Sequence, residues 1–320
     1  MQSRLISDMK SPGPIGRTTL VVVKAEMRAF TSKPGQFLSL TLRDRSGELE
    51  GKMWEPPANI LERLGAGTPV SVKGRLSKWR DRFELTIDEL EVLNASAISP
   101  ADFLPSCKTP IAEMWTSLEE LIALVTDEDL KGLLDEFCQS ELKEVFCKAP
   151  ASRSWHHGYL GGLLEHTLSV ATICNEVGQR RNDVDLSMLI TGAIFHDLGK
   201  IDDYRFDTVI DHTMSGKLLG HIMTGYHRLL SMIEKIPSFP KDKAMRLCHI
   251  IVSHHGKAEW GAPRPPKTIE AHIVHFADNM DAQVNGFGLI LEEGRERKVD
   301  WSSYSKILGT EVLCKFPEDK

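Results

Sequence analysis

The first part of the chain alternates apolar and polar residues with the period of two that is typical of half-buried β-strands. This pattern predicts a long strand over residues 18–30 and a hairpin over residues 36–54, with its turn at residues 44–47. A short helix opened by proline is expected at residues 56–65, and two more strands at residues 68–93. The sequence therefore predicts five strands and one short helix in fewer than 100 residues.

The strand order is typical of an OB-type barrel, and a linker and helices follow it. Residues 94–110 contain three prolines and small polar residues, as linkers do. From residue 111 apolar residues recur at three- and four-residue steps, which predicts helices to the C-terminus, interrupted by a loop at residues 254–268. We expect a multidomain α+β protein with an OB-type β-barrel over 1–95, a linker and helical lead-in over 96–150, and an all-α helical bundle over 151–320.

Composition and charge narrow the class of protein. Hydrophobic residues make up 41% and charged residues 26% of the 320 residues, as in soluble globular proteins. No segment has the ~18 to 20 uncharged apolar residues of a membrane span, and the N-terminus lacks the apolar part of a signal peptide, so we expect a cytoplasmic protein. Six cysteines without a C-x-x-C pair indicate reduced thiols.

Charged residues and histidines are unevenly distributed. Residues 1–95 carry 15 lysines and arginines against 12 aspartates and glutamates, whereas the remainder carries 24 against 33. This small positive excess is weak support for a nucleic-acid partner, since most such differences reflect a solvated surface. All 12 histidines lie between His156 and His275, so we expect the chemistry in that region.

Histidine and aspartate residues occur at five positions along the predicted helices, each with apolar neighbours at helical spacing. A lone histidine on an apolar helix face is more often a hydrogen-bonded core residue than a ligand. Five inward positions are different, because buried polar groups need partners and their apolar neighbours offer few. A shared metal centre would satisfy them together. The candidate ligands are His166, His196, Asp197, His221, His254, His255 and Asp278.

Imidazole and carboxylate ligands without cysteine suit Mn²⁺, Fe²⁺, Mg²⁺, Co²⁺ or Zn²⁺. The candidates outnumber the ligands of one tetrahedral ion, so two ions are the simpler interpretation. Asp197 could bridge them at the ~3.5 to 4 Å separation typical of two-metal hydrolases. Gly199 follows the His196-Asp197 pair closely enough to cap its helix, and Gly192 would let that helix pack closely.

The order H…HD…H…H…D, with "GGLLEHT", "HDLGK" and "HFADNMDA" around its members, resembles the HD superfamily of metal-dependent phosphohydrolases. The resemblance implies two ion sites that share one carboxylate. The first site would contain His166, His196, Asp197 and Asp278. The second would contain Asp197, His221 and His254, and the spacing leaves open whether His255 replaces or joins His254.

Other residues near these ligands are candidates for substrate contacts. Lys200 lies one turn beyond His196, where its ammonium group could meet a phosphate or the leaving oxygen; the alternative is a lysine favoured near a helix C-terminus. His156 and His157 precede the first ligand helix and are candidates for binding phosphate or orienting a ligand. We assign Asp197 and Lys200 as the catalytic residues.

The predicted barrel offers a candidate nucleic-acid surface. OB barrels commonly bind single strands through basic grooves and aromatic side chains on which bases stack. The alternative is a barrel that serves only as a structural module. The candidate contacts are Trp54, Lys73, Arg75, Trp79, Arg80, Arg82 and Phe83.

Over nearly the whole chain, the domain order resembles the YhaM family of bacterial 3′-to-5′ exoribonucleases. The resemblance is carried by "LTLRDRSGELEGKMWE", "DFLP", "KAPASRSWHHGYLGGLLEHTLSV" and "SHHGKAEWGAPRPPKTIEAHIVHFADNMDA". It implies removal of nucleotides from the 3′ end of single-stranded RNA, and often of single-stranded DNA, with Mn²⁺ as a preferred ion. The expected products are nucleoside 5′-monophosphates. No membrane partner is expected, and the sequence does not define the oligomeric state.

Three alternatives remain at this point. A nucleotide or cyclic-nucleotide phosphohydrolase would use the barrel only for assembly. A non-catalytic RNA-binding protein would use the helical domain as a scaffold, although a scaffold has no reason to keep five inward His/Asp positions. An oxygenase would depend on O₂ and would leave the barrel unexplained.

Overall fold

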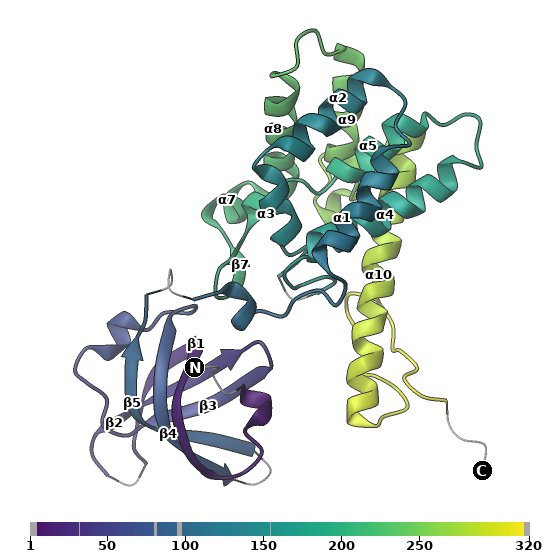
Figure 1. Cartoon of the computed structure of the whole chain (residues 1–320). Coiled ribbons are helices and arrows are strands. Elements are labelled where there is room, and N and C mark those ends of the chain that lie inside the picture. The colour runs from purple at the N-terminus through teal and green to yellow at the C-terminus, as the bar shows by residue number, and fades with distance from the viewer. Residues whose placement is uncertain (1–4, 32, 80–81, 95–97, 154, 317–320) are drawn as a thin grey trace. The chain divides into compact units, whose positions relative to one another are not determined.

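The computed structural model describes residues 5–31, 33–79, 82–94, 98–153 and 155–316. The chain forms two compact units (Figure 1). One comprises Met1–Ser106 and Arg205–Asp211, and the other Cys107–Tyr204 and His212–Lys320. Among the described residues, no helix is both long and apolar enough to cross a membrane.

The first unit contains a closed five-stranded barrel, as predicted. Its strands are β1 Gly13–Ala29, β2 Gln36–Asp44, β3 Gly47–Met53, β4 Pro69–Trp79 and β5 Arg82–Val92. They pair in the order β1-β2-β3-β5-β4, and β1 also pairs with β4. β3 and β5 run parallel, whereas the other neighbours are antiparallel. A 3₁₀ turn, η2 Ile60–Arg63, lies where the short helix was expected.

The leucines that alternate along β2 fill the barrel. Leu38, Leu40 and Leu42 are almost fully buried and belong to one apolar cluster with residues of the other four strands. The carboxylate of Asp44 accepts a hydrogen bond from the backbone N–H of Ser46 at 2.7 Å, which stabilises the turn into β3. The alternation in the sequence thus placed the core of the barrel correctly.

The second unit is mainly helical. Its helices are α1 Ile111–Ile122, α2 Glu128–Gln139, α3 Leu142–Lys148, α4 Gly162–Gly178, α5 Leu186–Phe195, α6 Lys200–Asp203, α7 Met214–Leu218, α8 Gly220–Ile233, α9 Lys241–Ser253 and α10 Ile269–Arg297. Helix α4 packs against α5 and α10, and α5 also packs against α9. The four helices that carry or precede most of the candidate ligands therefore lie against one another.

Side-chain caps fix where two of these helices begin. The carboxylate of Asp185 accepts a hydrogen bond from the backbone N–H of Met188 at 3.0 Å, at the start of α5. The hydroxyl of Thr268 accepts one from the N–H of Ala271 at 3.2 Å, at the start of α10. Such caps satisfy backbone donors that the first helical turn leaves unpaired.

A β-hairpin between α6 and α7 was not predicted. Its strands are β6 Tyr204–Phe206 and β7 Ile210–His212, and its tip belongs to the barrel unit. In that unit the hydroxyl of Thr208 donates a hydrogen bond to the carbonyl oxygen of Gly67 at 2.6 Å. The hairpin strands are three residues long, too short for an alternating pattern to reveal them.

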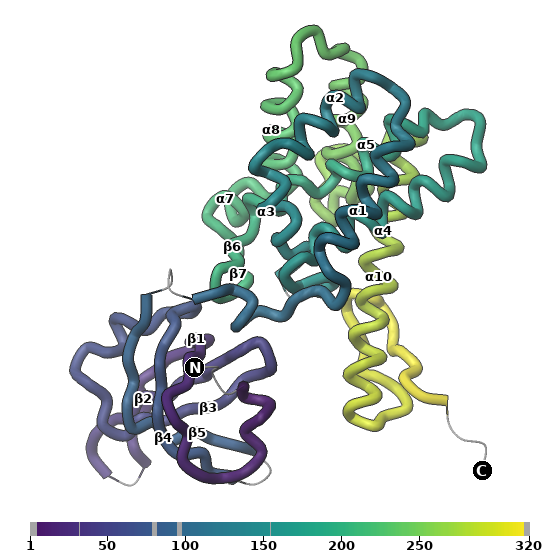
Figure 2. Tube along the Cα trace, viewed as in Figure 1, coloured from purple at the N-terminus to yellow at the C-terminus, as the bar shows by residue number. Residues whose placement is uncertain are grey.

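The expectation of helix up to the C-terminus was wrong beyond Arg297. Lys298 adopts the left-handed conformation, with φ of 55°, and ends α10. The chain then turns back along the second half of α10, as Figure 2 shows. There Gly294 leaves room for Cys314, since a Cβ at Gly294 would lie 2.2 Å from the cysteine sulfur. An isolated bridge joins Trp301 to Leu313.

Candidate metal centre

The folded helices bring all the predicted ligands together. His166 lies in α4, the His196-Asp197 pair directly after α5, His221 in α8, His254 and His255 directly after α9, and Asp278 in α10. Within each of two groups, the ligand atoms lie within 4.8 Å of one another. The first group is His166, His196, Asp197 and Asp278, and the second is His221, His254 and His255.

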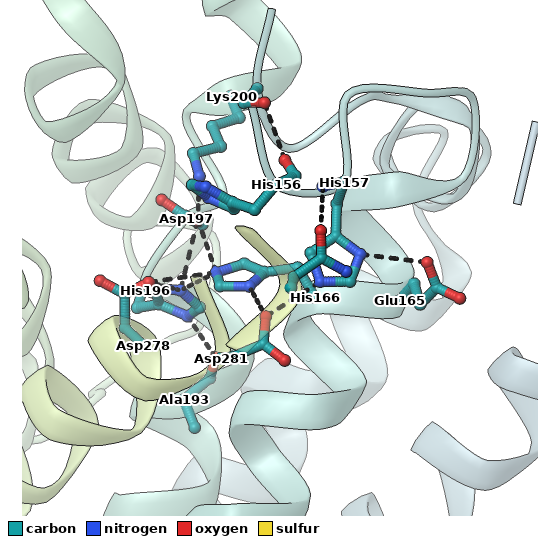
Figure 3. A network of polar contacts seen from close by, with 12 residues as sticks. His156, His157, Glu165, His166, Ala193, His196, Asp197, Lys200, Asp278 and Asp281 are labelled. Carbon is teal, nitrogen blue, oxygen red and sulfur yellow. Dashed lines mark hydrogen bonds and ion pairs between the residues drawn. The ribbon is translucent and has the colours of Figure 1, made fainter. Parts of the chain in front are cut away.

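Asp197 lies between the two groups. Its Oδ2 is 3.2 Å from Nε2 of His166 and 3.3 Å from Nε2 of His196 (Figure 3). Its Oδ1 is 3.5 Å from Nε2 of both His221 and His254. Both oxygens are buried and lack a partner in hydrogen-bond geometry, although Oδ2 forms an ion pair with Lys200. One oxygen faces each group of histidines, as in a carboxylate that bridges two ions.

Backbone carbonyls orient three of the imidazoles. Nδ1 of His196 and Nδ1 of His254 each lie 2.7 Å from the carbonyl oxygen three residues earlier. Nδ1 of His255 lies 2.7 Å from the carbonyl oxygen five residues later. A carbonyl oxygen only accepts, so Nδ1 is the donor in each bond. These hydrogen bonds leave Nε2 of each ring as the nitrogen that can bind a metal.

Carboxylates lie beside the other two imidazoles. Nδ1 of His166 is hydrogen-bonded to Oδ2 of Asp281 at 2.6 Å, whereas Nδ1 of His221 is 3.7 Å from Oδ2 of Asp203, beyond hydrogen-bond distance. Nε2 of His221 and Nε2 of His254 are buried without a hydrogen-bond partner. Buried polar atoms of this kind are rare unless a ligand or ion satisfies them. These two nitrogens and Oδ1 of Asp197 therefore fit a metal centre.

The ionisation of these groups also fits bound cations. Burial lowers the pKa of His221 and His254, and burial together with the neighbouring His254 lowers the pKa of His255 to about 4. These rings are neutral at pH 7, the form that binds metal. Burial opposes ionisation of Asp197, but the Lys200 ammonium group helps to hold its pKa well below the usual value.

The pKa of His166 shows most directly that negative charge is in excess in the first group of ligands. Burial by itself lowers its pKa, but the carboxylates of Asp197, Asp278 and Asp281 outweigh burial and raise the pKa well above its usual value. Since metal binding displaces protons from imidazole ligands, a divalent ion would take the place of that proton. The first group is thus arranged to attract a cation.

A layer of polar side chains behind His166 holds it in place (Figure 3). Oδ2 of Asp281, the partner of His166, is also 3.0 Å from Nε2 of His157. Nδ1 of His157 is 3.0 Å from Oε2 of Glu165, which also accepts a hydrogen bond from the hydroxyl of Tyr159. Both ring nitrogens of His157 are engaged, which favours its orienting role over phosphate binding.

His156 and Lys200, in contrast, lie close to the first group of ligands. Lys200 is 5% exposed, and its Nζ is 2.5 Å from Oδ2 of Asp197. The His156 ring lies 5.5 Å from the His166 ring, and its Nδ1 has no hydrogen-bond partner. Burial and the nearby Lys200 lower the pKa of His156 to about 3, so the ring is neutral.

Four supporting residues were not predicted: Asp281, Glu165, Tyr159 and Asp203. The sequence did hold a signal for Asp281, which lies one turn beyond Asp278 on α10. It held none for Asp203, because that residue meets His221 from another helix. His275 also has a supporting position, since its Nδ1 donates to the carbonyl oxygen of His254 at 2.7 Å.

The two glycines near the His196-Asp197 pair act through close packing. A Cβ at Gly192 would lie 2.4 Å from the side chain of Ile250, so this glycine allows tight packing as expected. Gly199 does not cap the end of α5 as expected, since its φ is −69° and it directly precedes α6. A Cβ there would instead lie 2.0 Å from the carbonyl oxygen of His221, which explains why the position needs glycine.

On the barrel, acidic neighbours pair with Lys73, a predicted contact, and with Arg17, which was not predicted. Nζ of Lys73 is 2.7 Å from Oε1 of Glu89. Arg17 lies 2.8 Å from Glu89 and 3.1 Å from Glu91. Such exposed pairs contribute little stability, but they reduce the positive field that a phosphate would meet.

The other predicted barrel contacts differ in their surroundings. Arg75 and Arg82 are exposed, whereas Phe83 is half-buried and packs against the core of the barrel. The expectations for Arg80 and for the side chain of Trp79 lie outside the described residues. The β4–β5 hairpin therefore offers exposed arginines, but Phe83 serves the core.

Trp54 belongs to an aromatic platform that also contains Phe30 and Phe37. The Trp54 ring is nearly parallel to that of Phe30, at 19° and 5.9 Å, and lies 5.1 Å from that of Phe37. Trp54 is 44% exposed. Nζ of Lys33 lies 4.4 Å from the Phe30 ring centre, and Nζ of Lys52 lies 6.0 Å from that of Trp54. Phe30 and Phe37 were not predicted.

Comparisons with known proteins agree with this architecture. Residues 163–283 match the family model of the HD domain, and residues 21–93 match that of the OB-fold nucleic acid binding domain. A domain of replication protein A from Methanococcus maripaludis is 24% identical, covering 29% of this chain and 97% of that chain, with a TM-score of 0.25. The HD domain of the L. monocytogenes phosphodiesterase PgpH is 19% identical, covering 49% and 82%, with a TM-score of 0.32. Structural likenesses this low carry no weight for function.

The similarity in sequence to one curated relative is far more extensive. The 3′-5′ exoribonuclease YhaM of Bacillus subtilis (strain 168) is 30% identical to this chain over 273 residues. The match covers 85% of this chain and 86% of the relative, and so includes most of both units. This chain belongs to the YhaM family of 3′-5′ exoribonucleases.

Proposed function

We propose that this protein is a metal-dependent 3′-to-5′ exoribonuclease that hydrolyses single-stranded RNA from its 3′ end and releases nucleoside 5′-monophosphates. The observation that carries the proposal is the position of Asp197, with one carboxylate oxygen toward each group of histidines. Membership of the YhaM family supports the polarity and the RNA substrate. Residues 1–95 would bind the RNA strand, and residues 151–320 would hydrolyse it. Residues 96–150 would connect these two parts of the chain.

The donor set fits two divalent ions. His166, His196, Asp197 and Asp278 would hold one, and Asp197, His221, His254 and His255 the other. The inclusion of both His254 and His255 is supported by their free Nε2 atoms. When bound, such ions neutralise charge on phosphoryl oxygens and lower the pKa of water. We propose Mn²⁺, with Mg²⁺, Co²⁺, Fe²⁺ and Zn²⁺ as the alternatives to be measured.

Two side chains of this chain would act directly on the substrate. Lys200 presents an ammonium group beside Asp197, where it would attract the scissile phosphate and stabilise negative charge on the departing oxygen. His156, neutral and with an unpartnered Nδ1, would hydrogen-bond the terminal phosphate or ribose. His157 would act from behind, by holding Asp281 against His166.

The barrel would hold the strand through the aromatic platform of Phe30, Phe37 and Trp54. Aromatic rings stack on any base, which suits an enzyme that degrades strands of varied sequence. Lys33 places an ammonium group beside these rings, where the phosphates of a stacked strand would pass. Lys52 also lies beside Trp54, but its ammonium group is paired with Glu84 at 2.5 Å. The exposed Arg75 and Arg82 are further candidates for phosphate contacts, and the same chemistry would accept single-stranded DNA.

A ladder assay tests this function. A 20-nucleotide RNA labelled at its 5′ end is incubated with the intact protein and Mn²⁺, and a second sample carries the label at the 3′ end. We expect the 5′ label to appear in a ladder of progressively shorter strands, and the 3′ label to be released at once as a nucleoside 5′-monophosphate. Asp197→Asn is the inactive control.

Three results would contradict the proposal. Shortening from the 5′ end would reverse the polarity, and failure to shorten RNA with any of the five ions would exclude the activity. Turnover of free nucleotides or cyclic nucleotides without any RNA ladder would support a small-molecule phosphohydrolase instead. Repeating the assay with single-stranded DNA measures the choice of sugar.

A further inference from the structure

A cavity beside the second half of α10 lies outside the groups of metal ligands. Its volume is about 330 Å³, and its lining includes Trp155, Trp301, Tyr304, Arg297 and Ser303. Trp301 is 56% exposed and Tyr304 is 61% exposed, although both are large aromatic residues. Exposed aromatic side chains gathered around one cavity are typical of a binding site.

Close backbone contacts hold the walls of this cavity in place. A Cβ at Gly286 would lie 2.3 Å from the ring of Trp155, so this glycine lets the ring pack directly on α10. Gly294 accommodates Cys314 in the same way, and the left-handed turn at Lys298 sends the tail back along the helix (Figure 2). The cavity is therefore a built feature of the C-terminal region rather than a gap between loose segments.

The cavity lies along α10, several nucleotides from the reacting end of a bound strand. Trp155 directly precedes His156, which lies against the first group of ligands. Along α10, the lining residues Ile290 to Arg297 lie 12 to 19 residues beyond Asp278, which corresponds to about 18 to 28 Å at 1.5 Å per residue. A strand with stacked bases advances about 3.4 Å per nucleotide, so this distance corresponds to roughly five to eight nucleotides.

The chemistry of the lining suits a nucleobase and its phosphate. Three aromatic side chains can stack on a base without regard to its identity. The guanidinium group of Arg297 lies at the rim, paired with Glu293 at 2.7 Å, and the side chains of both residues are exposed. Ser303 adds a hydroxyl group for hydrogen bonds to base or sugar edges.

We propose that this cavity is a nucleotide subsite that holds a base of the single strand about five to eight nucleotides from the 3′ end. The proposal rests on the proposed exonuclease function. The subsite would anchor the strand on the 5′ side of the metal centre, independently of the aromatic platform of the barrel. Its expected signature is a dependence of the rate on strand length, because a shorter strand cannot reach it.

The test measures kcat/KM for RNA strands of about two to twelve nucleotides and of about 20 nucleotides. For the wild-type protein we expect a rise at about six to nine nucleotides. In the double variant Trp301→Ala/Tyr304→Ala this rise should disappear, with a loss of about tenfold on longer strands and no change on the dinucleotide. Ile307→Ala, an exposed residue of the same tail outside the cavity lining, is the matched control.

A modified substrate identifies the contact directly. An abasic nucleotide is placed in turn at the positions about five to eight nucleotides from the 3′ end. At the position that reaches the cavity it should reduce kcat/KM of the wild type about tenfold, and it should have little further effect in the double variant. Trp301→Phe keeps an aromatic ring and should retain the length dependence. Thermal unfolding of each variant shows whether the tail is still folded, and Tyr304→Ala alone replaces the double variant if that variant unfolds.

The outcomes separate the two proposals. If the wild type does not degrade RNA, the exonuclease function fails. If the wild type degrades RNA but the double variant keeps the rise with length, the subsite proposal fails alone. Equal losses for the double variant and for Ile307→Ala would also overturn it, since the tail would then act only through folding.

Discussion

The metal centre and the outer surface of the barrel differ in the burial of their polar and charged groups and in the partners of these groups. In the metal centre, Oδ2 of Asp197 is paired with Lys200, but Oδ1 of Asp197 and Nε2 of His221 and of His254 are buried without hydrogen-bond partners. On the barrel, the exposed Lys73 is paired with Glu89. Leaving a buried polar atom unpaired costs free energy, whereas a charge on the surface is solvated by water.

This difference explains which part of the sequence was informative. A histidine or aspartate in an apolar stripe of a helix needs a polar partner that its neighbours do not supply, and several such residues together predicted one shared metal centre. A lysine on an exposed strand is solvated by water and needs no partner, so basic residues were a weak guide to the nucleic-acid surface. The aromatic platform, which includes Phe30 and Phe37, was identified from the packing of rings in the structure and not from the charges along the sequence.

Asp197→Asn should have the largest effect. The amide keeps the size of the side chain but removes the negative charge between the two groups of ligands, so both ion sites should weaken together. We expect the rate to fall by at least ~10³. Bound metal per chain, measured by elemental analysis, should fall as well. Asp202→Asn, whose partner is Arg228, is the control; full metal content in Asp197→Asn would contradict the bridging position.

Asp281→Asn should have the next largest effect. The change weakens the hold on Nδ1 of His166, which is 2.6 Å from the carboxylate. Removing such a supporting carboxylate typically costs 10- to 100-fold in metal affinity. A metal titration followed by RNA hydrolysis measures this loss, with Asp183→Asn in a surface ion pair as the control. An unchanged metal affinity would mean that Asp281 does not position His166.

Trp54→Ala tests the barrel. Loss of one stacking ring should weaken binding of a 20-nucleotide RNA about tenfold. Turnover of a dinucleotide should be unchanged, because the metal centre is intact. Filter binding and dinucleotide kinetics measure the two effects. Unchanged RNA affinity, with an unchanged unfolding temperature, would exclude the aromatic platform as the binding surface.

Lys73→Gln should have the smallest effect. Lys73 is paired with Glu89, and both side chains are about half exposed, so removing its charge should change RNA affinity less than about twofold. The same filter-binding measurement applies. A tenfold loss of RNA affinity would indicate that the nucleic-acid surface lies on β4 and β5. It would also contradict the contrast between the metal centre and the barrel surface.

Regular patterns made most of the fold predictable. Alternation gave the five strands of the barrel, and helical spacing placed every candidate ligand on or next to a helix. The β6–β7 hairpin and the non-helical tail beyond Lys298 escaped this method. Strands of three residues carry no period, and the left-handed turn at Lys298 is made by a residue type that usually continues a helix.

The ligands of the site were predictable, but their orientation was not. Helical spacing shows that His221 faces inward, yet it cannot show that Asp203 meets its Nδ1. The partner of His166, Asp281, lies 115 residues away in the chain. Such contacts depend on how helices distant in sequence are placed in space, which a local pattern does not record.

Gly199 has a consequence for the spacing of the two ion sites. Its backbone touches the backbone of α8 at His221 and Gly225, with no side chain between them, and the hydroxyl of Thr224 donates to its carbonyl oxygen at 3.1 Å. Asp197 lies two residues before this contact, and His221 lies at it. The separation between the Asp197 carboxylate and the His221 imidazole therefore depends on a contact between two backbones. Substitution of neighbouring side chains would not alter that contact.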